Sequence, residues 1–535
     1  MFKIIIIICC ILTSWYIPSS GGAGVRLAYN LLFLLLLGSG LVLSPLFASA
    51  QSRIQPNNNW LYIGFLCLCV PWLFYIKDDR GSFILILAFF CWWLTQKWYI
   101  SRQAKNNVVL LIFFVALAQC VIALIQVFCP QLAMHVYEYD WIRNHGRPYG
   151  IFQQVNLLAS FLATGIGCGF FLLLRETRKI PVCLYCTGLS ALTFTLSIIQ
   201  SRAGIIGMLT VLAGLWFIAR FKNKRKVISV FVLMSLSFTA GAWVVSHTHI
   251  MINGEMISMA REFRQSDKAR FFILKATLVM IALKPWLGWG YGTYEYAFSR
   301  FIMTHPQPEY QFGVITHPHN ELLYAWFQGG MIALVGVIFL VIGWIKNVIA
   351  EGKHKAASAG YSLLVLPFLV HLNLEYPFYQ SFIHLAVFVT LLRLGERDIP
   401  AGEIKHAYRK TMLVSLLGVA LISYSLLALY THSQLTHYER AGYIGYPDAT
   451  PWYFDTQYER AKYDSMVSLL IKFNATHDAN LLNEFMSQAQ KYSLHHNDRN
   501  IWLSMISIAQ YQGEPGKAEA LTKEYHLLFP QEDAE

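Results

Sequence analysis

Three amide side chains stand close together at the start of one apolar segment. Gln153, Gln154 and Asn156 follow the polar run His145–Tyr149 and lie in the expected first turns of a helix. Amides there can bind sugar hydroxyls, or they can satisfy the free backbone N–H groups of the helix start. The sequence leaves both interpretations open.

Two arginines lie next to other apolar segments. Arg202 is expected in a tight Ser-Arg-Ala-Gly turn, and Arg270 precedes the stretch 271–280, which has the pattern of an amphipathic surface helix. A guanidinium binds phosphate oxygens through two parallel charge-assisted hydrogen bonds. Taken singly, each could instead be an arginine that snorkels towards the membrane surface.

A fourth polar segment, 316–321, precedes a long apolar run and contains His317, His319, Asn320 and Glu321. A zinc site would need further ligands, and the sequence has no His-Glu-x-x-His pattern. An imidazole near two arginines fits acid–base or phosphate chemistry better. We therefore expect neither a metal nor another cofactor.

The composition indicates that these segments belong to a membrane protein. Of 535 residues, 56% are hydrophobic and only 13% are charged, against roughly 25% charged in ordinary soluble domains. This balance excludes a soluble enzyme. Ionisable groups at membrane depth cost about 2.5–3.5 kcal/mol each, so a group of them at one face indicates function.

Runs of about 20 apolar residues predict the membrane-spanning helices. We expect an all-α polytopic membrane protein with about 12–13 transmembrane helices. The predicted spans are 3–18, 27–48, 60–76, 82–98, 108–129, 151–174, 181–199, 204–219, 227–246, 321–345, 356–372, 378–394 and 411–430.

The distribution of Lys and Arg predicts the orientation. With a cytoplasmic N-terminus, 21 Lys and Arg fall in the inner segments and 6 in the short outer loops, as the positive-inside rule requires. The formal net charge of +12 divides into +18 for residues 1–430 and −6 for residues 431–535. We attribute the positive charge to topology and expect no nucleic-acid partner.

This topology divides the chain into four regions. They are N-terminal transmembrane helices (1–246), a large periplasmic loop with an amphipathic helix (247–320), C-terminal transmembrane helices (321–430) and a soluble helical tail (431–535). In the tail, Trp502, Gly513, Ala518 and Pro530 match four positions of a tetratricopeptide repeat, which predicts a TPR-like domain. The topology places the tail and all four polar segments outside the cytoplasm.

Three motifs resemble a known family. His319-Asn320, nine residues and then Gly330 resemble the signature of the O-antigen ligase superfamily, although Ala333 departs from its last position. The segment 146–159 resembles one found in bacterial protein O-oligosaccharyltransferases of the PglL type, which act in pilin glycosylation. Glu375-Tyr376-Pro377 resembles their downstream tyrosine motif.

The resemblance implies transfer of a preassembled glycan from undecaprenyl pyrophosphate to Ser or Thr of a pilin-like protein, at the periplasmic face of the bacterial inner membrane. The partners would be this lipid-linked donor, the acceptor protein and the bilayer. We assign catalytic roles to His319, Arg202 and Arg270. His319 would act as the base or steady the phosphate. Substrate binding is assigned to Arg147, Gln153, Gln154, Asn156, Asn320, Glu321 and Tyr376.

Two alternatives remain. A ligase or polymerase of the same superfamily would use the same chemistry with a lipid A core or a glycan as acceptor. A transporter would line a path with the same polar residues, but transporters commonly contain two related halves. No such repeat is evident here, and the polar segments gather at one face.

Overall fold

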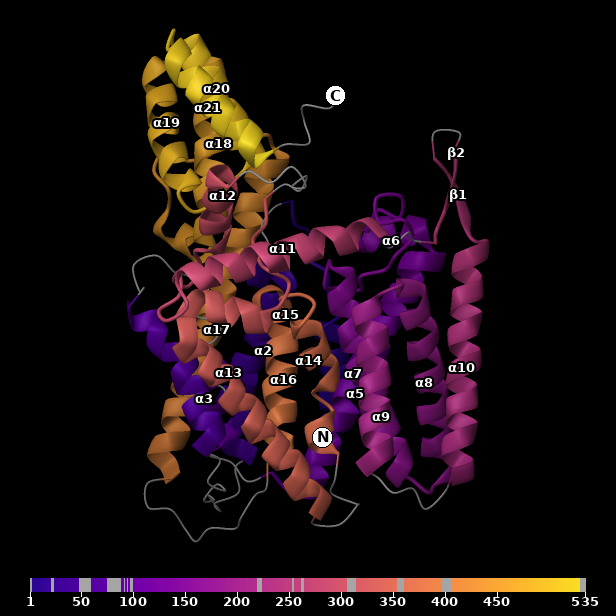
Figure 1. Cartoon of the computed structure of the whole chain (residues 1–535). Coiled ribbons are helices and arrows are strands. Elements are labelled where there is room, and N and C mark those ends of the chain that lie inside the picture. The colour runs from indigo at the N-terminus through magenta and orange to yellow at the C-terminus, as the bar shows by residue number, and fades with distance from the viewer. Residues whose placement is uncertain are drawn as a thin grey trace.

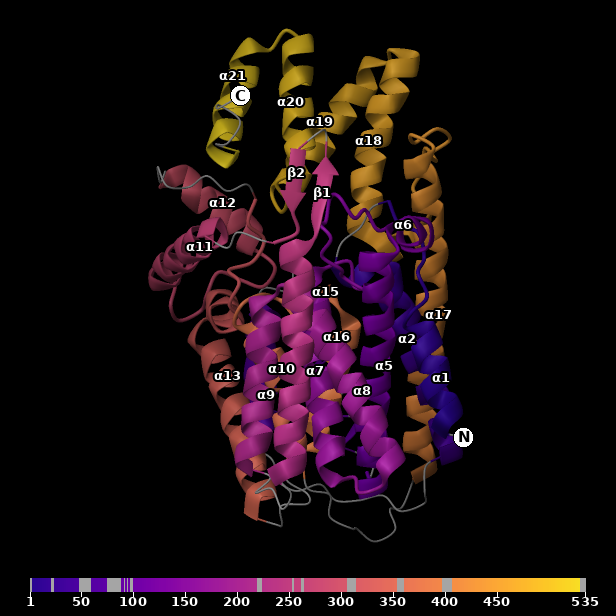
Figure 2. The same ribbon diagram turned by 90° about the vertical axis from the view of Figure 1, so that its right-hand side faces the viewer.

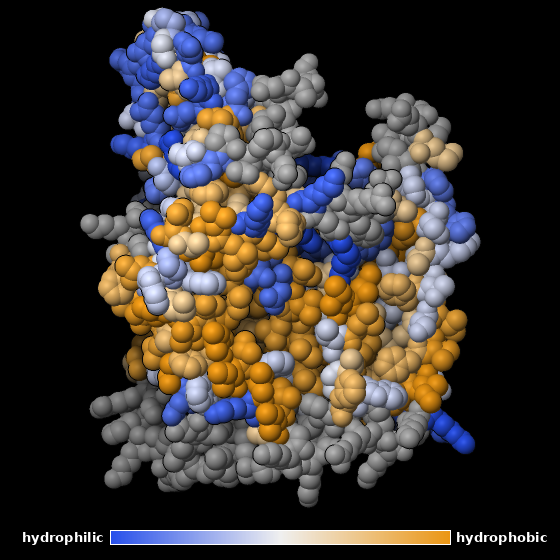
Figure 3. All heavy atoms as spheres, in the orientation of Figure 1, coloured by the Kyte–Doolittle hydropathy of each residue, from blue (hydrophilic) through white to orange (hydrophobic). Residues whose placement is uncertain are grey.

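The computed structural model describes residues 2–20, 24–47, 59–74, 88–90, 92–93, 95–96, 100–218, 224–252, 255–260, 264–305, 314–353, 360–396 and 407–529. A bundle of long helices forms the body of the molecule, and a group of shorter helices stands above one end of it (Figure 1). In the view of Figure 3, hydrophobic residues cover most of the bundle and hydrophilic ones cover the upper group. This is the surface expected of a protein embedded in a bilayer.

Among the described residues, six helices are long and apolar enough to cross a membrane. They are α5 (Arg102–Phe128), α7 (Val155–Arg175), α8 (Lys179–Ile199), α10 (Lys224–His247), α13 (Glu321–Lys353) and α17 (Ala407–Arg440). The structure thus shows a helical protein with six candidate membrane spans. Most of the other predicted crossings coincide with shorter helices.

Shorter apolar helices complete the bundle. These elements are α1 (Phe2–Leu12), η1 (Gly24–Arg26), α2 (Ala28–Phe47), α3 (Asn59–Cys69), η2 (Val70–Phe74), α9 (Arg202–Ile218), η3 (Tyr361–Leu363), α14 (Leu366–Leu372), α15 (Pro377–Gln380) and α16 (Phe382–Leu394). The predicted span 82–98 falls mostly outside the described residues, and every other predicted span overlaps a described helix. Arg202, expected in a turn, is the first residue of α9.

Helix α7 lies in the middle of the bundle, in contact with α5, α8, α9 and α14. Its sequence suits this position because Gly165, Gly167 and Gly169 let the neighbours approach closely. A Cβ at Gly165 would lie 2.3 Å from Cβ of Ala116. The surrounding helices therefore fix the start of α7, which carries the amides.

Helix α13 is broken near its N-terminal end. Gly330 has φ 61° and ψ −154°, a conformation that essentially only glycine adopts. The backbone of the preceding loop fills the break: Trp289 N–H donates to the Phe327 carbonyl (2.7 Å) and Met331 N–H to that of Trp286 (3.1 Å). The break explains why a glycine ends the His-Asn-x9-Gly motif.

The end of the bundle nearest the tail carries several short elements. They are α6 (Pro130–Tyr137), the hairpin β1 (His249–Ile252) and β2 (Glu255–Ser258), α11 (Arg264–Leu283) and α12 (Tyr294–Thr304). Helix α11 lies across this end, roughly perpendicular to the bundle (Figure 1). The predicted amphipathic helix 271–280 is the C-terminal part of α11. The antiparallel hairpin was not predicted, because its strands are only four residues each.

The tail follows directly from α17, which continues ten residues beyond the predicted span to Arg440. Its elements are η4 (Trp452–Gln457), α18 (Tyr458–Thr476), α19 (Ala479–Ser493), α20 (Arg499–Tyr511) and α21 (Pro515–Leu528). They stand beyond α12 in both views (Figures 1 and 2). The side chain of Asn497 donates to Ser299 Oγ (2.8 Å) and its backbone N–H to Glu295 (2.7 Å), which joins the tail to α12.

Candidate functional site

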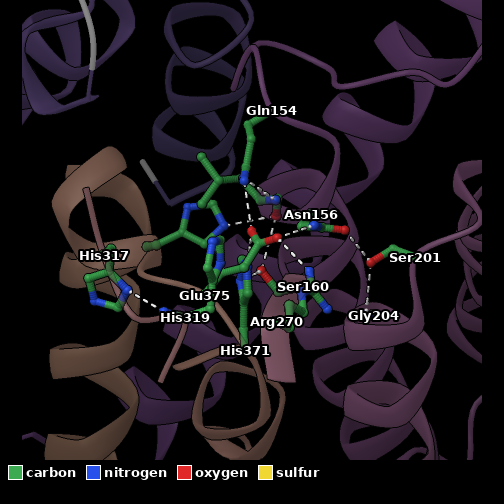
Figure 4. Close-up of polar contacts among 12 residues, drawn as sticks. Gln154, Asn156, Ser160, Ser201, Gly204, Arg270, His317, His319, His371 and Glu375 are labelled. Carbon is green, nitrogen blue, oxygen red and sulfur yellow. Dashed lines mark hydrogen bonds and ion pairs between the residues drawn. The ribbon is translucent and has the colours of Figure 1, made fainter. Parts of the chain in front are cut away.

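The carboxylate of Glu375 is the centre of a polar cluster at the tail-facing end of the bundle (Figure 4). Gln154 Nε2 donates to its Oε2 at 2.7 Å, and Asn156 Nδ2 donates to its Oε1 at 2.5 Å. Arg270 Nη2 lies 3.3 Å from Oε1, and His371 Nε2 lies 3.4 Å from Oε2. Segments more than 200 residues apart in the sequence therefore meet on one carboxylate.

The start of α7 holds the two amides in place. Gln154 caps the helix, because its Oε1 accepts the backbone N–H of Leu157 at 3.0 Å. Asn156 Oδ1 accepts the hydroxyl of Ser201 at 2.7 Å, and that hydroxyl also accepts the N–H of Gly204. Gln154 therefore satisfies a backbone N–H of the helix start, one of the two roles that the sequence left open, and the binding of sugar hydroxyls stays a prediction.

Glu375 is ionised. Burial alone would raise the pKa of its carboxyl, but hydrogen bonds and the nearby charge lower it. The side chains of His371 and Gln154 donate to it, and the net effect lowers the pKa of Glu375 to about 2. A buried anion at this place stabilises the guanidinium of Arg270, whose side chain is about a third exposed.

Two histidines lie on the other side of Glu375 from Asn156 (Figure 4). The ring of His317 stacks on that of Tyr376, with centroids 4.4 Å apart, and the ring of His319 lies 6.0 Å from the same tyrosine. His317 Nδ1 accepts the backbone N–H of His319 at 2.9 Å. This bond belongs to a tight turn in which His319 adopts φ 57°, a left-handed conformation unusual for a residue other than glycine.

The imidazole of His319 is neutral at pH 7. Burial lowers its pKa to about 4, and the positive charge of Arg270 acts in the same direction, against the opposing charge of Glu375. Burial also lowers the pKa of His317. Within the described part of the chain, Nδ1 of His319 is buried and makes no hydrogen bond. A neutral imidazole can accept a proton or a hydrogen bond.

The first residues of α13 complete this side of the cluster. Asn320 caps the helix by accepting the N–H of Leu323 at 3.0 Å, and its Nδ2 lies 3.5 Å from the side chain and carbonyl of Asn373. Glu321 lies 3.4 Å from His317 Nε2 and accepts the hydroxyl of Tyr379 at 3.1 Å. Asn320 and Glu321 therefore fix the turn that contains His319.

Three other predicted residues lie outside this hydrogen-bonded cluster. Arg202 follows Ser201 directly in the chain and is exposed. Arg147 donates from Nε to the carbonyl of Ile199 at 3.1 Å, so it ties the 138–150 loop to the end of α8. Gln153 lies in the turn before α7 with φ 56°. The geometry gives Arg147 a structural contact, and the role of Arg202 stays a prediction.

Sequence reasoning missed the central residue. Glu375 was noted only as part of a motif, and neither His371 nor its partner Ser160, 2.8 Å from His371 Nδ1, was assigned a role. One signal was available, since His371 and Glu375 are four residues apart in an apolar segment and so share one helix face. Within the part of the chain that the structure describes, no three His, Cys, Asp or Glu side chains gather as they would around a metal ion.

The cluster can bind an anion and activate a hydroxyl. Arg270 presents a partly exposed cation, and the neutral ring of His319 lies close enough to feel its charge. Amides and Tyr376 supply uncharged polar contacts beside them. These features define a class: a multi-pass membrane protein with a phosphate- and sugar-compatible site at one end of its bundle.

Comparisons with known families show which proteins of this class the chain is similar to. Residues 187–338 match the family model described as O-antigen ligase, and residues 148–173 match the one described as protein glycosylation ligase. Residues 360–535 match the C-terminal part of virulence factor membrane-bound polymerases. Each of these models covers less than half of the chain, so the chain is similar to O-antigen ligases and protein glycosylation ligases over separate segments.

A curated relative agrees with this assignment. The O-antigen ligase of Salmonella typhimurium (strain LT2) is 27% identical to this chain over 93 residues. The aligned part covers 17% of this chain and 22% of that protein. The similarity therefore concerns about a fifth of the relative's length.

Proposed function

We propose that this chain is an O-linked oligosaccharyltransferase. It moves a preassembled glycan en bloc from undecaprenyl pyrophosphate to Ser or Thr of a periplasmic, pilin-like protein. Neither a metal ion nor a nucleotide takes part. The proposal makes the Glu375 cluster the place where donor and acceptor meet.

One observation carries the proposal. Gln154 and Asn156 belong to the segment that matches protein glycosylation ligases, and Arg270 belongs to the segment that matches O-antigen ligases. Both segments contribute to the same carboxylate, Glu375. Residues from the segments that match the two ligase families thus lie around one carboxylate, which supports a site shared by donor and acceptor.

The reaction needs a stabilised leaving group. The acceptor oxygen attacks the anomeric carbon of the glycan, and the bond from that carbon to the phosphate oxygen breaks. Undecaprenyl pyrophosphate leaves with the electron pair and an added negative charge. Guanidinium groups fixed before the reaction stabilise this charge without reorganisation. Arg270 is held by Glu375 for this role, and Arg202 at the start of α9 supplies a second cation.

The acceptor hydroxyl must lose its proton during the attack, and His319 takes it. Burial holds the pKa of His319 near 4, which makes it a weak base. The negative charge of a bound pyrophosphate would raise that pKa. His319 then becomes an effective base only after the donor has bound, which protects the site from idle proton transfer.

Gln153, Gln154, Asn156, Asn320 and Tyr376 would contact the sugar or the acceptor. Their amide and phenol groups can both donate hydrogen bonds to hydroxyls and accept them. Glu321 would position His317. Arg147 would hold the loop that precedes the amides.

We also propose a membrane topology. Thirteen crossings with a cytoplasmic N-terminus would place the cluster and the tail in the periplasm. Two facts support this: α1 begins towards the end of the bundle opposite the tail (Figure 2), and the cluster lies at the tail's end. The four predicted regions, 1–246, 247–320, 321–430 and 431–535, follow from it. The paired helices α18–α19 and α20–α21 suit a TPR-like domain.

A second candidate has its own support. The Salmonella relative is named an O-antigen ligase, and the tail region matches membrane-bound polymerases. In that case the acceptor would be a lipid A core or a growing glycan, and the chemistry at Glu375, Arg270 and His319 would stay the same.

One experiment separates the candidates. The purified full-length chain is incubated in vesicles with an undecaprenyl-pyrophosphate-linked glycan, a pilin-like protein and lipid A core, and each product is weighed by mass spectrometry. Glycan mass on a Ser or Thr of the protein supports the proposal. Glycan on lipid A core or on another glycan supports the second candidate instead. Transfer to none of these by wild type, or equal transfer by His319→Ala, contradicts both.

A further inference from the structure

His317 is a buried histidine to which the proposed reaction assigns no step. It lies two residues before His319, in the turn that leads into α13, and it is 3% exposed. Its ring packs against Tyr324, with centroids 4.2 Å apart, and stacks on Tyr376 at 4.4 Å. Buried polar groups are hydrogen-bonded in almost all native structures. The partners of the His317 ring therefore indicate what it does.

Each ring nitrogen of His317 has a polar neighbour. Nδ1 accepts the backbone N–H of His319 at 2.9 Å (Figure 4), so Nδ1 carries no proton. A neutral imidazole carries its proton on the other nitrogen. That nitrogen, Nε2, lies 3.4 Å from Glu321 Oε2. Burial lowers the pKa of His317 and so keeps the ring neutral. The contacts thus select one tautomer, in which Nδ1 is an acceptor for the amide of His319.

The amide that His317 holds belongs to a strained residue. His319 has φ 57°, in the left-handed region that residues other than glycine seldom adopt. Such a conformation persists only where the surrounding structure enforces it. Pro318 has no N–H of its own, and it favours an extended backbone at the residue before it. The bond from His319 N–H to His317 Nδ1 is a local contact that holds this turn closed.

The direction of the His319 side chain depends on the same turn. A change of backbone conformation at His319 would turn its Cα–Cβ bond and carry the imidazole away from its present place. In the closed turn the ring lies 6.0 Å from that of Tyr376, measured between centroids. Misplacement of a reacting group by about 1 Å can cost about a hundredfold in rate. The geometry of the turn therefore matters for a base at this position.

We propose that His317 is the positioning residue for His319, an inference that rests on the proposed function of His319 as the base. Nδ1 of His317 holds the strained turn from which the His319 side chain reaches the Glu375 cluster. Glu321 orients the His317 ring through Nε2. His317 thus acts on the reaction through the backbone of its neighbour and not by contact with a substrate.

Two variants separate this role from a packing role. In His317→Asn, Oδ1 is as many bonds from the backbone as Nδ1 of histidine, and asparagine side chains commonly accept the N–H two residues further on. His317→Phe keeps a ring that can stack on Tyr376 but has no acceptor. The Asn variant should transfer glycan within about threefold of wild type. The Phe variant should lose about a hundredfold in kcat, with the KM for the donor unchanged. A packing role predicts the opposite order.

Hydrogen exchange measures the bond itself. The full-length proteins in phosphatidylcholine vesicles are exchanged into heavy water and digested, and the peptide that contains residues 317–320 is weighed by mass spectrometry. The His319 amide should exchange at least about tenfold faster in His317→Phe than in wild type or His317→Asn. His305 is the matched control, because it is an exposed histidine at the end of α12. Its Asn and Phe variants should match wild type in exchange and in transfer.

Three results would overturn the inference: full transfer by His317→Phe, transfer by His317→Asn as low as by His317→Phe, or equal exchange of the His319 amide in His317→Phe and wild type. Thermal unfolding of each variant checks that it is folded.

The variants are assayed on whichever product wild type makes, so their order does not depend on the acceptor. Higher transfer by the Asn variant than by the Phe variant, with lipid A core as the sole acceptor, would refute the proposed function and support the inference. Transfer to protein in the reverse order would do the opposite. If wild type transfers glycan to nothing, the proposed function fails, and the exchange rates alone decide whether His317 holds the turn.

Discussion

The charge of Glu375 leads to a quantitative expectation for Glu375→Gln. The pKa of this carboxyl is about 2, against an ordinary value of 4.5. Because each pKa unit corresponds to about 1.36 kcal/mol, the folded protein favours the ionised form by about 3 kcal/mol. Glutamine lacks the charge and places an N–H₂ group against the donors of Gln154 or Asn156. We expect the free energy of unfolding to fall by about 3 kcal/mol at pH 7, as for other buried ion pairs that lose one partner.

The assay is equilibrium unfolding of the purified protein in mixed micelles, followed by tryptophan fluorescence at several pH values. The folded-state pKa of Glu375 lies below the unfolded one, so its contribution is complete above about pH 4.5 and is lost as the pH falls towards 2. The difference between wild type and Glu375→Gln should shrink over that range. Glu514→Gln is the control: Glu514 is an exposed partner of Lys517, and we expect a change below about 1 kcal/mol.

Glu375→Gln should also lower the rate of glycan transfer. The rate should fall by a larger factor than the loss of stability alone would cause. Glu375 fixes Gln154, Asn156 and Arg270, and displacement of reacting groups by about 1 Å can cost about a hundredfold in rate. Two results would refute the reasoning: equal stability of Glu375→Gln and wild type at pH 7, or a stability difference that is the same at pH 3 as at pH 7. Full transfer by the folded variant would remove Glu375 from the site's function.

Three further predictions concern other residues. Arg202→Lys and Arg270→Lys should each lose transfer while the protein stays in the membrane, because lysine cannot form the two parallel bonds of a guanidinium; normal glycosylation by both would contradict the phosphate-binding role. His319→Gln should lose product and should also change the pH dependence of stability. The pKa of His319 is lowered to about 4, so wild type should lose stability as the pH falls from about 6.5 to 4, and a variant with the same loss would show that His319 is not its source. Gly330→Ala should destabilise the protein by several kcal/mol, because a Cβ there would lie 2.1 Å from the Trp286 carbonyl oxygen, whereas Gly516→Ala, with open space around it, should change thermal unfolding little.

The sequence predicted several of the long apolar helices because the physical signal is local. A run of about 20 apolar residues must form a helix in lipid, whatever its neighbours are. Hence the segments 108–129, 151–174 and 181–199 differ from α5, α7 and α8 by only a few residues at each end. The hairpin after α10 was missed, since four-residue strands leave no periodic signal that exceeds the background.

Residue types also marked part of the site. His319, Arg270 and the amides Gln154 and Asn156 were predicted because polar groups next to apolar runs are costly and therefore informative. The sequence showed Gly330 as part of a motif but gave no reason why a glycine is needed there. Its cause is a loop backbone inserted into a broken helix, a contact between distant segments.

The sequence by itself determined which segments are apolar enough to form long helices and which few polar residues lie next to them. The tertiary structure decided that Glu375 is the common partner of Gln154, Asn156, Arg270 and His371. It also decided that Arg147 ties a loop to α8. The physical reason is that a side chain's cost of burial is fixed by its own chemistry, whereas its partner is fixed by how distant helices pack.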